Sequence, residues 1–213
     1  MLSLSTAESC TPANPMTQRK PYHHGNLREA LLQAAIRLIR EVGPLAFTLR
    51  EVARRAGVSH NAPYRHFRNK EELIAAVATE GYQELTAAMV AAAKEQSDAL
   101  DRLKHAGLAY IRFALRRPEH FTVMFEAPFS EQQHPDAARA AKQAFSTLIT
   151  LVAECQEKKL LPSGDAGDYA LLAWSMVHGI AKLAITGRLP YSGTASVLKF
   201  SRFVIDQSLP RRG

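Results

Sequence analysis

Residues 48–70 place two short helical segments around one tight turn, and this pattern restricts the fold of the chain more than any other feature. Thr48 and Glu51 form a capping box, in which the Thr hydroxyl accepts a hydrogen bond from a free backbone N–H and the Glu carboxylate reaches back to the cap. A helix is therefore expected directly after Thr48. Gly57 can adopt the left-handed conformation that ends such a helix.

A second helix is expected after this turn, with Ser59 or Asn61 as its cap. Because Pro63 has no backbone N–H, it fits best into the first turn of a helix, and this helix should begin effectively at Asn61. Two short helices joined in this way predict a helix-turn-helix. Polar side chains on the second helix can reach phosphates or base edges, as a helix in the major groove of DNA must.

The positive charge of the chain lies mainly in the same region. The sequence has 213 residues and a formal net charge of +7. Lys and Arg clearly outnumber Asp and Glu between Arg19 and Lys70, whereas the two kinds nearly balance over the remainder. A basic segment that coincides with a helix-turn-helix is typical of a nucleic-acid-binding module on a larger domain. A basic surface that serves only solubility would not explain this coincidence.

The chain around the motif is predicted to be helical throughout. A first helix from Asn26 to Gly43 supports the motif, and a long helix capped by Asn69 continues to about Glu95 as a rigid strut. Further helices are expected over residues 97–117, 119–126, 136–160, 169–187 and 194–207, with Pro or Gly residues between them. Residues 169–187 are apolar nearly all round, so both faces of that helix should be covered.

These elements predict an all-α protein. An unstructured tail at 1–18 precedes an N-terminal three-helix DNA-binding domain at 19–70, and a long helix joins that domain to a helical ligand-binding and dimerisation domain at 71–210. No segment alternates apolar and polar residues over the length of a strand.

Two strings of residues carry a family pattern. Residues 47–59 read FTLREVARRAGVS, and residues 64–77 read YRHFRNKEELIAAV. Together they closely resemble the signature of the TetR/AcrR family of bacterial transcriptional regulators, over Leu27–Val77. In addition, residues 174–179 read W-x-x-V-H-G, which resembles the Trp-His-Gly variety of the C-terminal domain in this family. The resemblance implies a ligand-responsive regulator, most often a repressor, that binds a palindromic operator as a homodimer and is released by a small-molecule effector.

Several side chains are candidates for contacts with the DNA backbone. Thr48 and Arg50 lie at a helix N-terminus, where free N–H groups and the helix dipole favour a phosphate, and Lys70 lies beside the next N-terminus. Tyr64 and His66 are expected to make further backbone contacts. The alternative for these two rings is that they pack against Phe67 and the first helix.

Base recognition is expected from the start of the second helix. His60 and Asn61 are the candidates, because Asn can pair with adenine through two hydrogen bonds, and the small Ala62 lets the DNA approach closely. Arg65 could face either the bases or the protein. The complete set of candidate DNA-binding residues is Thr48, Arg50, Ser59, His60, Asn61, Ala62, Tyr64, Arg65, His66 and Lys70.

The resemblance also implies an effector pocket and a dimer interface in the C-terminal domain. Pocket candidates combine apolar bulk with a few polar tips, and they are Tyr110, Phe113, Met124, Phe125, Trp174 and His178. The last two helices resemble the four-helix dimer interface of the family, with Leu171, Ala181, Ile185, Val197 and Val204 as candidate contacts. For each of these residues, packing within a single chain is the alternative.

Two other functions compete with a regulator. A helical enzyme or ligand carrier could bind an acidic substrate on the basic surface, and an architectural DNA-binding protein could work without an effector. The sequence contains no G-x-S-x-G, Walker-type loop, H-E-x-x-H or paired-carboxylate motif, and its eight His are scattered. No catalytic activity, cofactor or metal site is therefore expected. Two Cys, no secretory signal and no long apolar run predict a cytoplasmic protein without a membrane segment.

Overall fold

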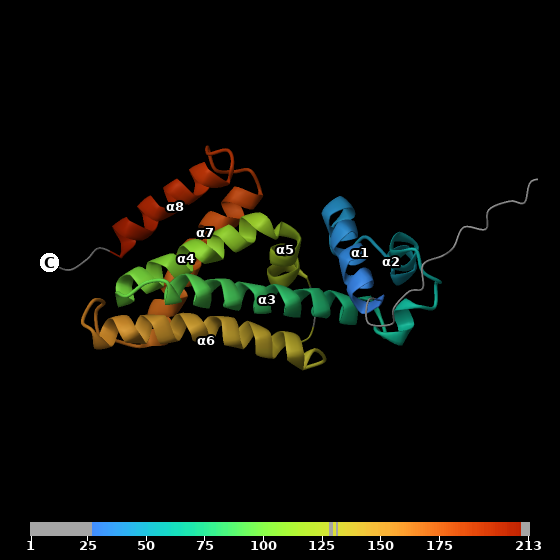
Figure 1. Ribbon diagram of the computed structural model, residues 1–213, viewed down its shortest axis with the longest axis horizontal. Coiled ribbons are helices and arrows are strands. Elements are labelled where there is room, and N and C mark those ends of the chain that lie inside the picture. Colours follow the sequence, from blue (N-terminus) through green and yellow to red (C-terminus); the bar gives the residue numbers. More distant parts are fainter. Residues whose placement is uncertain (1–26, 128–129, 131, 210–213) are drawn as a thin grey trace, which may run out of the picture.

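The computed structural model describes residues 27–127, 130 and 132–209 (Figure 1). The predicted tail at 1–18 and the expected helix cap at Asn26 lie outside these residues. Within them the regular structure is entirely helical, without a strand, so the all-α prediction is confirmed. The elements are α1 (Leu27–Val42), α2 (Leu49–Ala56), the 3-10 turn η2 (Pro63–Arg65), α3 (Lys70–Lys94), α4 (Ala99–Arg116), α5 (Pro118–Glu126), α6 (Pro135–Glu157), α7 (Ala166–Ile185) and α8 (Thr194–Ser208).

Helix α3 is the long element that links the two ends of the molecule (Figure 1). Its N-terminal part packs against α1, and its remaining length packs against α4, α5 and α6. Leu73, Val77 and Leu85 of α3 are almost completely buried along this path. The side chain of Asn69 accepts a hydrogen bond from the backbone N–H of Glu72 over 2.8 Å, which confirms the predicted cap.

The caps of α2 follow the sequence prediction in detail. The Thr48 hydroxyl accepts a hydrogen bond from the Glu51 N–H over 3.3 Å, and the Thr48 N–H donates to the Glu51 carboxylate over 2.7 Å. Gly57 ends the helix in the left-handed conformation, with φ of 70°. Gly43 ends α1 in the same way, with φ of 82°. Local side-chain chemistry therefore fixes both ends of α2.

The second helix of the motif is shorter than predicted. It was expected to begin at Asn61, but the chain forms a single 3-10 turn at Pro63–Arg65, with Ala62 before it. Because Pro63 cannot donate a backbone hydrogen bond, the turn that precedes it closes separately, through the Ala62 N–H and the Ser59 carbonyl at 3.0 Å. Phe67 is 2% exposed and anchors the other end of the element in the core. The prediction of a regular helix from Asn61 is therefore wrong.

The helices after α3, from α4 to α8, form the body of the molecule and lie close to their predicted ranges. The Asp98 carboxylate caps α4 by accepting from the backbone N–H groups of Leu100 and Asp101. Arg117 separates α4 from α5, which begins at Pro118, and α6 ends at Glu157, slightly before the expected position. No helix among the described residues is long and apolar enough to cross a membrane.

Helix α7 differs from its prediction in one respect. Both faces were expected to be covered, but Leu171, Leu172 and Leu183 are exposed by 49%, 67% and 43%. Phe203 of the neighbouring α8 is exposed by 61%. The inner faces of both helices pack on α4 instead. A single copy of the chain therefore leaves the outer apolar side of α7 and α8 in water.

Candidate nucleic-acid interface and ligand pocket

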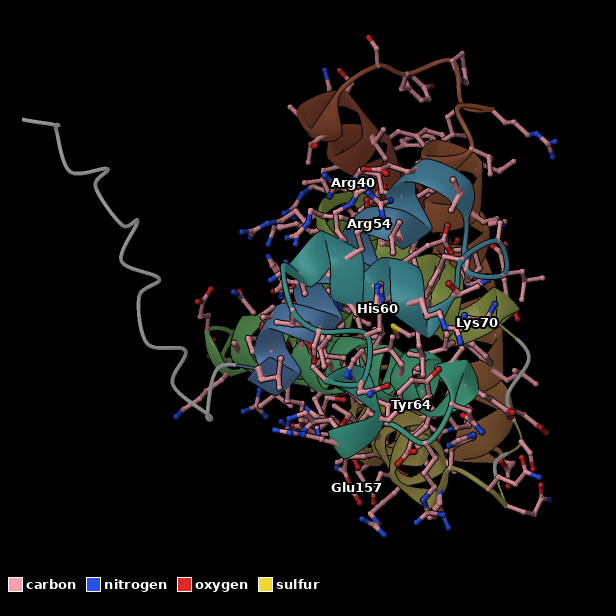
Figure 2. The ribbon with its side chains drawn as sticks, turned by 90° about the vertical axis from the view of Figure 1, so that its right-hand side faces the viewer. Arg40, Arg54, His60, Tyr64, Lys70 and Glu157 are labelled. Carbon is pink, nitrogen blue, oxygen red and sulfur yellow. The ribbon has the colours of Figure 1, made fainter. Side chains whose placement is uncertain are left out.

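The end of the molecule formed by α2, η2 and the start of α3 presents most of the predicted DNA contacts. Figure 2 looks onto this end, where the labelled His60, Tyr64 and Lys70 lie together. The side chains that are exposed there belong to Thr48, Arg50, Ser59, His60, Asn61, Tyr64 and Arg65, while His66 and Lys70 are half-buried. Ala62 is buried, so its methyl group faces the protein and not the surface.

The two aromatic side chains of η2 and its flank behave differently. Tyr64 is 52% exposed, so the alternative that it packs into the core does not hold. The His66 ring lies 6.4 Å from the Phe67 ring, in a tilted arrangement, and so is partly covered. Tyr64 is therefore the more accessible of the two for a phosphate.

Lys70 is held in position by the loop between α1 and α2. Its ammonium group donates to the Leu45 carbonyl over 2.8 Å and lies 5.3 Å from the centre of the Phe47 ring. An ammonium has three donors, so this arrangement leaves donors for a phosphate. The contact also joins the start of α3 to the loop before α2, which fixes the two helix N-termini relative to each other.

The N-terminus of α2 carries its own carboxylate. The Glu51 side chain accepts from both the hydroxyl and the backbone N–H of Thr48. The hydrogen bond from the Thr48 side chain, and then the one from its backbone, hold the pKa of Glu51 below its usual value. The capping box is thus a charged structural unit next to the expected phosphate positions.

One basic residue on this surface was missed by the sequence reasoning. Arg54 is exposed near the C-terminal end of α2 and is visible on the face in Figure 2. Its neighbour Arg55 points to α1 instead and binds the Glu41 carboxylate through both guanidinium NH₂ groups, at 2.6 and 2.5 Å. The two adjacent arginines in the sequence indicate a basic site. Only the packing of α2 on α1 shows that Arg55 is paired with Glu41 while Arg54 stays exposed.

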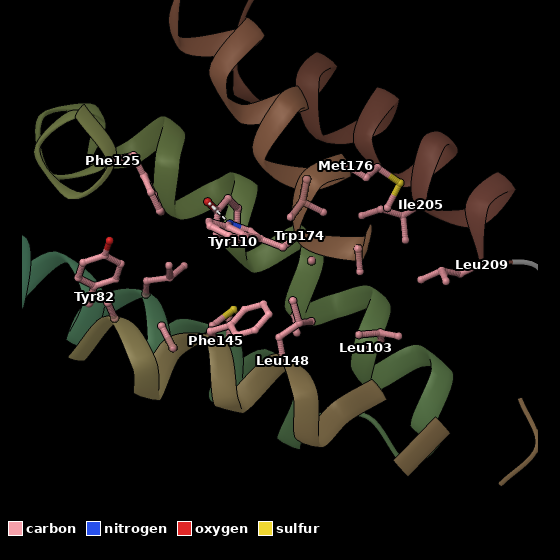
Figure 3. A pocket seen from close by; sticks show the side chains of 18 residues that line it. Tyr82, Leu103, Tyr110, Phe125, Phe145, Leu148, Trp174, Met176, Ile205 and Leu209 are labelled. Atoms are coloured by element: carbon pink, nitrogen blue, oxygen red, sulfur yellow. Dashed lines mark hydrogen bonds between the residues drawn. The ribbon is translucent and has the colours of Figure 1, made fainter. Parts of the chain in front are cut away.

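A pocket of about 120 Å³ lies between α3, α4, α5, α6, α7 and α8 (Figure 3). Three of the six predicted pocket residues line it, namely Tyr110, Phe125 and Trp174. Sequence reasoning missed several other large side chains of the lining, which include Tyr82, Met89, Phe145, Leu148 and Met176. Phe145 and Leu148 carried the signal of an inward-facing stripe on α6, but that signal does not distinguish a pocket wall from filled core.

The other three predicted pocket residues lie outside the lining. Phe113 and Met124 are buried in the core, and the Met124 sulfur fills the space above Gly81, where a Cβ atom would approach it to 2.6 Å. His178 lies behind Tyr110 and stacks on Phe121, with 5.2 Å between the ring centres. Their apolar or aromatic character was a correct sign of burial, but the direction of each side chain is set by the helix crossings.

The polar atoms of the pocket form a short chain of hydrogen bonds. The Trp174 ring N–H donates to the Tyr110 oxygen over 3.0 Å, and that oxygen lies 2.9 Å from Nδ1 of His178. Burial raises the pKa of the Tyr110 hydroxyl far above its usual value. Burial also lowers the pKa of His178, and the positive charge of Lys182 lowers it further. The site therefore favours neutral groups.

Helix α5 contacts both the pocket and helix α1. Phe125 lines the pocket, and the carbonyl of Met124 accepts a hydrogen bond from the Tyr82 hydroxyl over 2.8 Å. One and a half turns earlier, the Glu119 carboxylate binds the Arg40 guanidinium of α1 at 2.5 Å. Burial raises the pKa of Glu119, but the hydrogen bond and charge of Arg40 outweigh this effect and bring its pKa below the usual value.

His120 lies in the same junction. It is completely buried, and its Nε2 lies 3.5 Å from a carboxylate oxygen of Glu80 on α3. Contact with His120 holds the pKa of Glu80 below its usual value, although burial opposes this. The junction of α1, α3 and α5 therefore contains the Arg40–Glu119 ion pair and a histidine–carboxylate contact.

The predicted dimer contacts divide into two groups. Ala181 and Val197 are almost completely buried within the chain, so they cannot contact a second copy. Leu171 is exposed, while Ile185 and Val204 are half-buried. The reason is that α7 and α8 turn only part of the predicted stripes toward the rest of the chain and present other residues to solvent.

The stripe that α7 presents to solvent runs through Leu172, Gly179 and Leu183. These residues recur at spacings that keep them on one side of a helix. A Cβ atom added at Gly179 would meet no other atom within 4 Å. A second helix could therefore approach α7 closely at this point. Among the described residues there is no group of three or more His, Cys, Asp or Glu side chains that could hold a metal ion.

Two family models match the chain. Residues 31–77 match the model described as bacterial regulatory proteins of the tetR family. Residues 103–206 match the model described as the C-terminal domain of tetracyclin repressor-like proteins. The two matches correspond to the DNA-binding end and to the body, respectively.

Relatives along most of the chain include one curated regulator and several solved structures. The HTH-type transcriptional regulator BetI of Rhizobium meliloti is 30% identical over 173 residues, which is 80% of this chain and 83% of BetI. A protein of unknown function from Rhodococcus sp. RHA1 is 34% identical with a TM-score of 0.77, over 91% of this chain and 100% of that one. AibR in complex with isovaleryl coenzyme A and operator DNA shares the fold, with a TM-score of 0.72 at 18% identity, over 87% of this chain and 100% of AibR.

Proposed function

Because the chain belongs to the tetR family of bacterial regulatory proteins, it is a DNA-binding transcriptional regulator, and we propose that it represses transcription as a homodimer released from a palindromic operator by a small molecule. The observation that carries this proposal is the position of α5. Phe125 of this helix lines the apolar pocket, and Glu119 of the same helix binds Arg40 of α1. A ligand that displaces Phe125 would therefore shift the contact that positions the DNA-binding end.

The dimer is supported by the apolar surface that a single chain leaves exposed. Leu172, Leu183 and Phe203 lie on the outer side of α7 and α8. A two-fold pairing of this surface would cover these side chains and place two DNA-binding ends on one side of the dimer. Two such ends read two half-sites, which is why a palindrome is expected.

DNA recognition is proposed for the surface around η2. Asn61 and His60 are exposed beside the 3-10 turn and would reach base edges, while Tyr64, Arg50 and Lys70 would bind phosphates. Arg54 joins this set, since it is exposed on the same face. Because η2 is a single turn, the base-reading side chains come mainly from the loop before it.

The route from the pocket to the DNA runs through a short series of contacts. Phe125 meets the ligand, the rigid α5 carries the displacement, and the Glu119 carboxylate transmits it to Arg40. The Glu80 and His120 contact ties the same helix to α3. AibR, which shares this fold, was solved with both an acyl coenzyme A and operator DNA, so one protein with this architecture accommodates both kinds of partner. DNA as the target also implies a cytoplasmic location.

Selection of duplex DNA by the purified protein tests this function. The expected result is enrichment of a short inverted repeat, with one half-site for each subunit. Enrichment of no sequence would contradict the proposal and favour the architectural alternative. Turnover of a small molecule would favour the alternative of a helical enzyme.

A further inference from the structure

We infer that the effector is an uncharged, mainly apolar molecule, of which the pocket encloses roughly six non-hydrogen atoms with at most one polar group. This inference rests on the proposed function, because it names the ligand of the same pocket. It follows from the composition of the pocket wall, the hydrogen bonds already present within that wall, and the volume that the wall encloses.

The wall of the pocket contains no charged side chain. All the described residues that line it are apolar or aromatic, and none is Asp, Glu, Lys, Arg or His. A charged ligand group in this wall would lose its hydration without gaining an opposite charge. The same environment favours the neutral forms of two titratable groups, because burial raises the pKa of Tyr110 and lowers the pKa of His178.

The polar atoms of the wall are already bound within the protein. Three lining side chains carry a nitrogen or oxygen, namely Tyr82, Tyr110 and Trp174. The Tyr82 hydroxyl donates to a backbone carbonyl, and the Trp174 N–H donates to the Tyr110 oxygen, which also binds His178. A hydroxyl oxygen can accept one more hydrogen bond, so the wall offers a ligand little more than a single polar contact.

Two basic residues next to the wall are paired as well. Arg102 and Lys104 flank the lining residue Leu103 along α4. Arg102 binds the Glu154 carboxylate at 2.8 Å, and Lys104 binds Asp206 at 2.8 Å. An anionic ligand, including the phosphates of coenzyme A, would have to compete with these carboxylates to pair with Arg102 or Lys104. This argues against an anionic portion at this edge of the pocket.

The volume of the pocket sets the size of the ligand part that the wall can enclose. This volume is about 120 Å³, and one side of the pocket is open. Since an apolar cavity of about 150 Å³ holds a molecule the size of benzene, the pocket encloses roughly six non-hydrogen atoms, and the rest of a longer chain would lie at the open side. The lining side chains in Figure 3 extend from Tyr82 and Phe125 at one end to Ile205 and Leu209 at the other, with Tyr110 and Trp174 between them. A medium-length alkyl chain or a single substituted ring fits this description.

A matched series of eight-carbon probes tests the inference on the full-length protein. The probes are octanol, octanoate, octylammonium and octanoyl coenzyme A, which share the chain and differ in charge. Trp174 is the only Trp of the sequence, so its fluorescence reports binding in the pocket wall. We expect octanol to bind at least ten-fold more tightly than each charged probe. Equal or tighter binding of any charged probe, or no binding of octanol, would overturn the inference.

Cavity-filling variants show whether octanol binds in this pocket. Ala141→Leu and Ala173→Leu enlarge two lining side chains on different helices, and at least one is expected to fold with an unchanged helical signal. Each folded variant should bind octanol at least ten-fold more weakly than the wild type. Ala87→Leu adds the same atoms at an exposed position of α3 and should change nothing. Unchanged binding by both pocket variants would place the ligand elsewhere and contradict the inference.

The experiments distinguish a wrong inference about the ligand from a wrong proposed function. Octanol that saturates the Trp174 signal without changing the affinity for the selected operator leaves the inference intact and refutes effector-controlled release. A charged probe that binds more tightly than octanol and releases the operator refutes the inference and leaves the proposed function intact.

Discussion

Replacement of Leu172 by Ala tests the proposed dimer through a single exposed side chain. Leu172 lies on the outer stripe of α7 and is 67% exposed in the single chain. Only about one third of its surface contacts the rest of the chain, so the variant should fold with nearly unchanged stability. In a dimer formed through this stripe, the remaining two thirds would be removed from water.

The effect on dimerisation follows from that exposed fraction. Complete burial of a Leu side chain stabilises by roughly 1.5–3 kcal/mol, so two thirds of it corresponds to about 1–2 kcal/mol. A two-fold interface contains the residue twice, which gives about 2–4 kcal/mol for each dimer. Since about 1.4 kcal/mol equals one factor of ten, the dimer dissociation constant should rise by a factor of about 30 to 1,000.

Sedimentation equilibrium over a dilution series measures this constant. Leu45→Ala is the matched control, because Leu45 is 65% exposed and lies in the loop between α1 and α2, far from α7 (Figure 1). It should leave the dissociation constant unchanged. Equal constants for both variants, or a wild-type protein that is monomeric at micromolar concentration, would refute the reasoning.

Five further predictions concern DNA binding, coupling, pH and thiol chemistry. Asn61→Ala should cost about 1–3 kcal/mol at one base pair and relax the sequence preference, and equal losses on specific and random DNA would contradict its base-reading role. Lys70→Ala should weaken binding to every sequence and reduce the slope of log K against log salt by about one, as measured by fluorescence anisotropy. Glu119→Gln should leave ligand affinity nearly unchanged but reduce the ligand-induced loss of operator affinity at least several-fold, and full coupling in this variant would exclude the α5 route. The pKa of Glu51 is lowered in the folded state, so the stability that Glu51 contributes is present above its unfolded pKa of about 4.3 and is lost as pH falls. In Glu51→Gln, the melting temperature should therefore fall less steeply between about pH 5 and pH 3 than in the wild type. Burial raises the pKa of Cys155 to about 11, so little of this thiol is ionised at about pH 8. In a variant without the other cysteine, the folded protein should react with a chromogenic disulfide at least about a hundred-fold more slowly than the unfolded protein.

Most of the fold could be predicted because helix ends depend on local chemistry. The capping box of Thr48 and Glu51, the Asn69 cap and the left-handed Gly57 each involve residues a few positions apart, so the sequence contains the whole interaction. The same holds for the apolar periodicity of the helices. The exception is η2, where the sequence predicts a regular helix from Asn61 but the chain forms a single 3-10 turn at Pro63–Arg65.

The functional surfaces could be predicted only in part. Exposed polar residues near a helix-turn-helix identify a DNA-binding surface, but Arg54 and Arg55 differ only in the partner that α1 provides. Tyr110, Phe125 and Trp174 share apolar bulk with Phe113 and Met124, and nothing in residue type separates pocket wall from filled core. That difference depends on where one packed helix leaves space beside another.

The sequence by itself determined the helices, the family and the location of the basic surface, since these depend on spacing, caps and residue type along the chain. The tertiary structure alone decided which stripe of α7 faces α4 and which faces solvent, and therefore that Ala181 is core while Leu172 is exposed. It also brought Glu119 to Arg40 across 79 positions of sequence and left an uncharged pocket beside the same helix. Helix α7 is apolar nearly all round, so its orientation is set by the shapes of the neighbouring side chains, and that information is distributed over the whole chain.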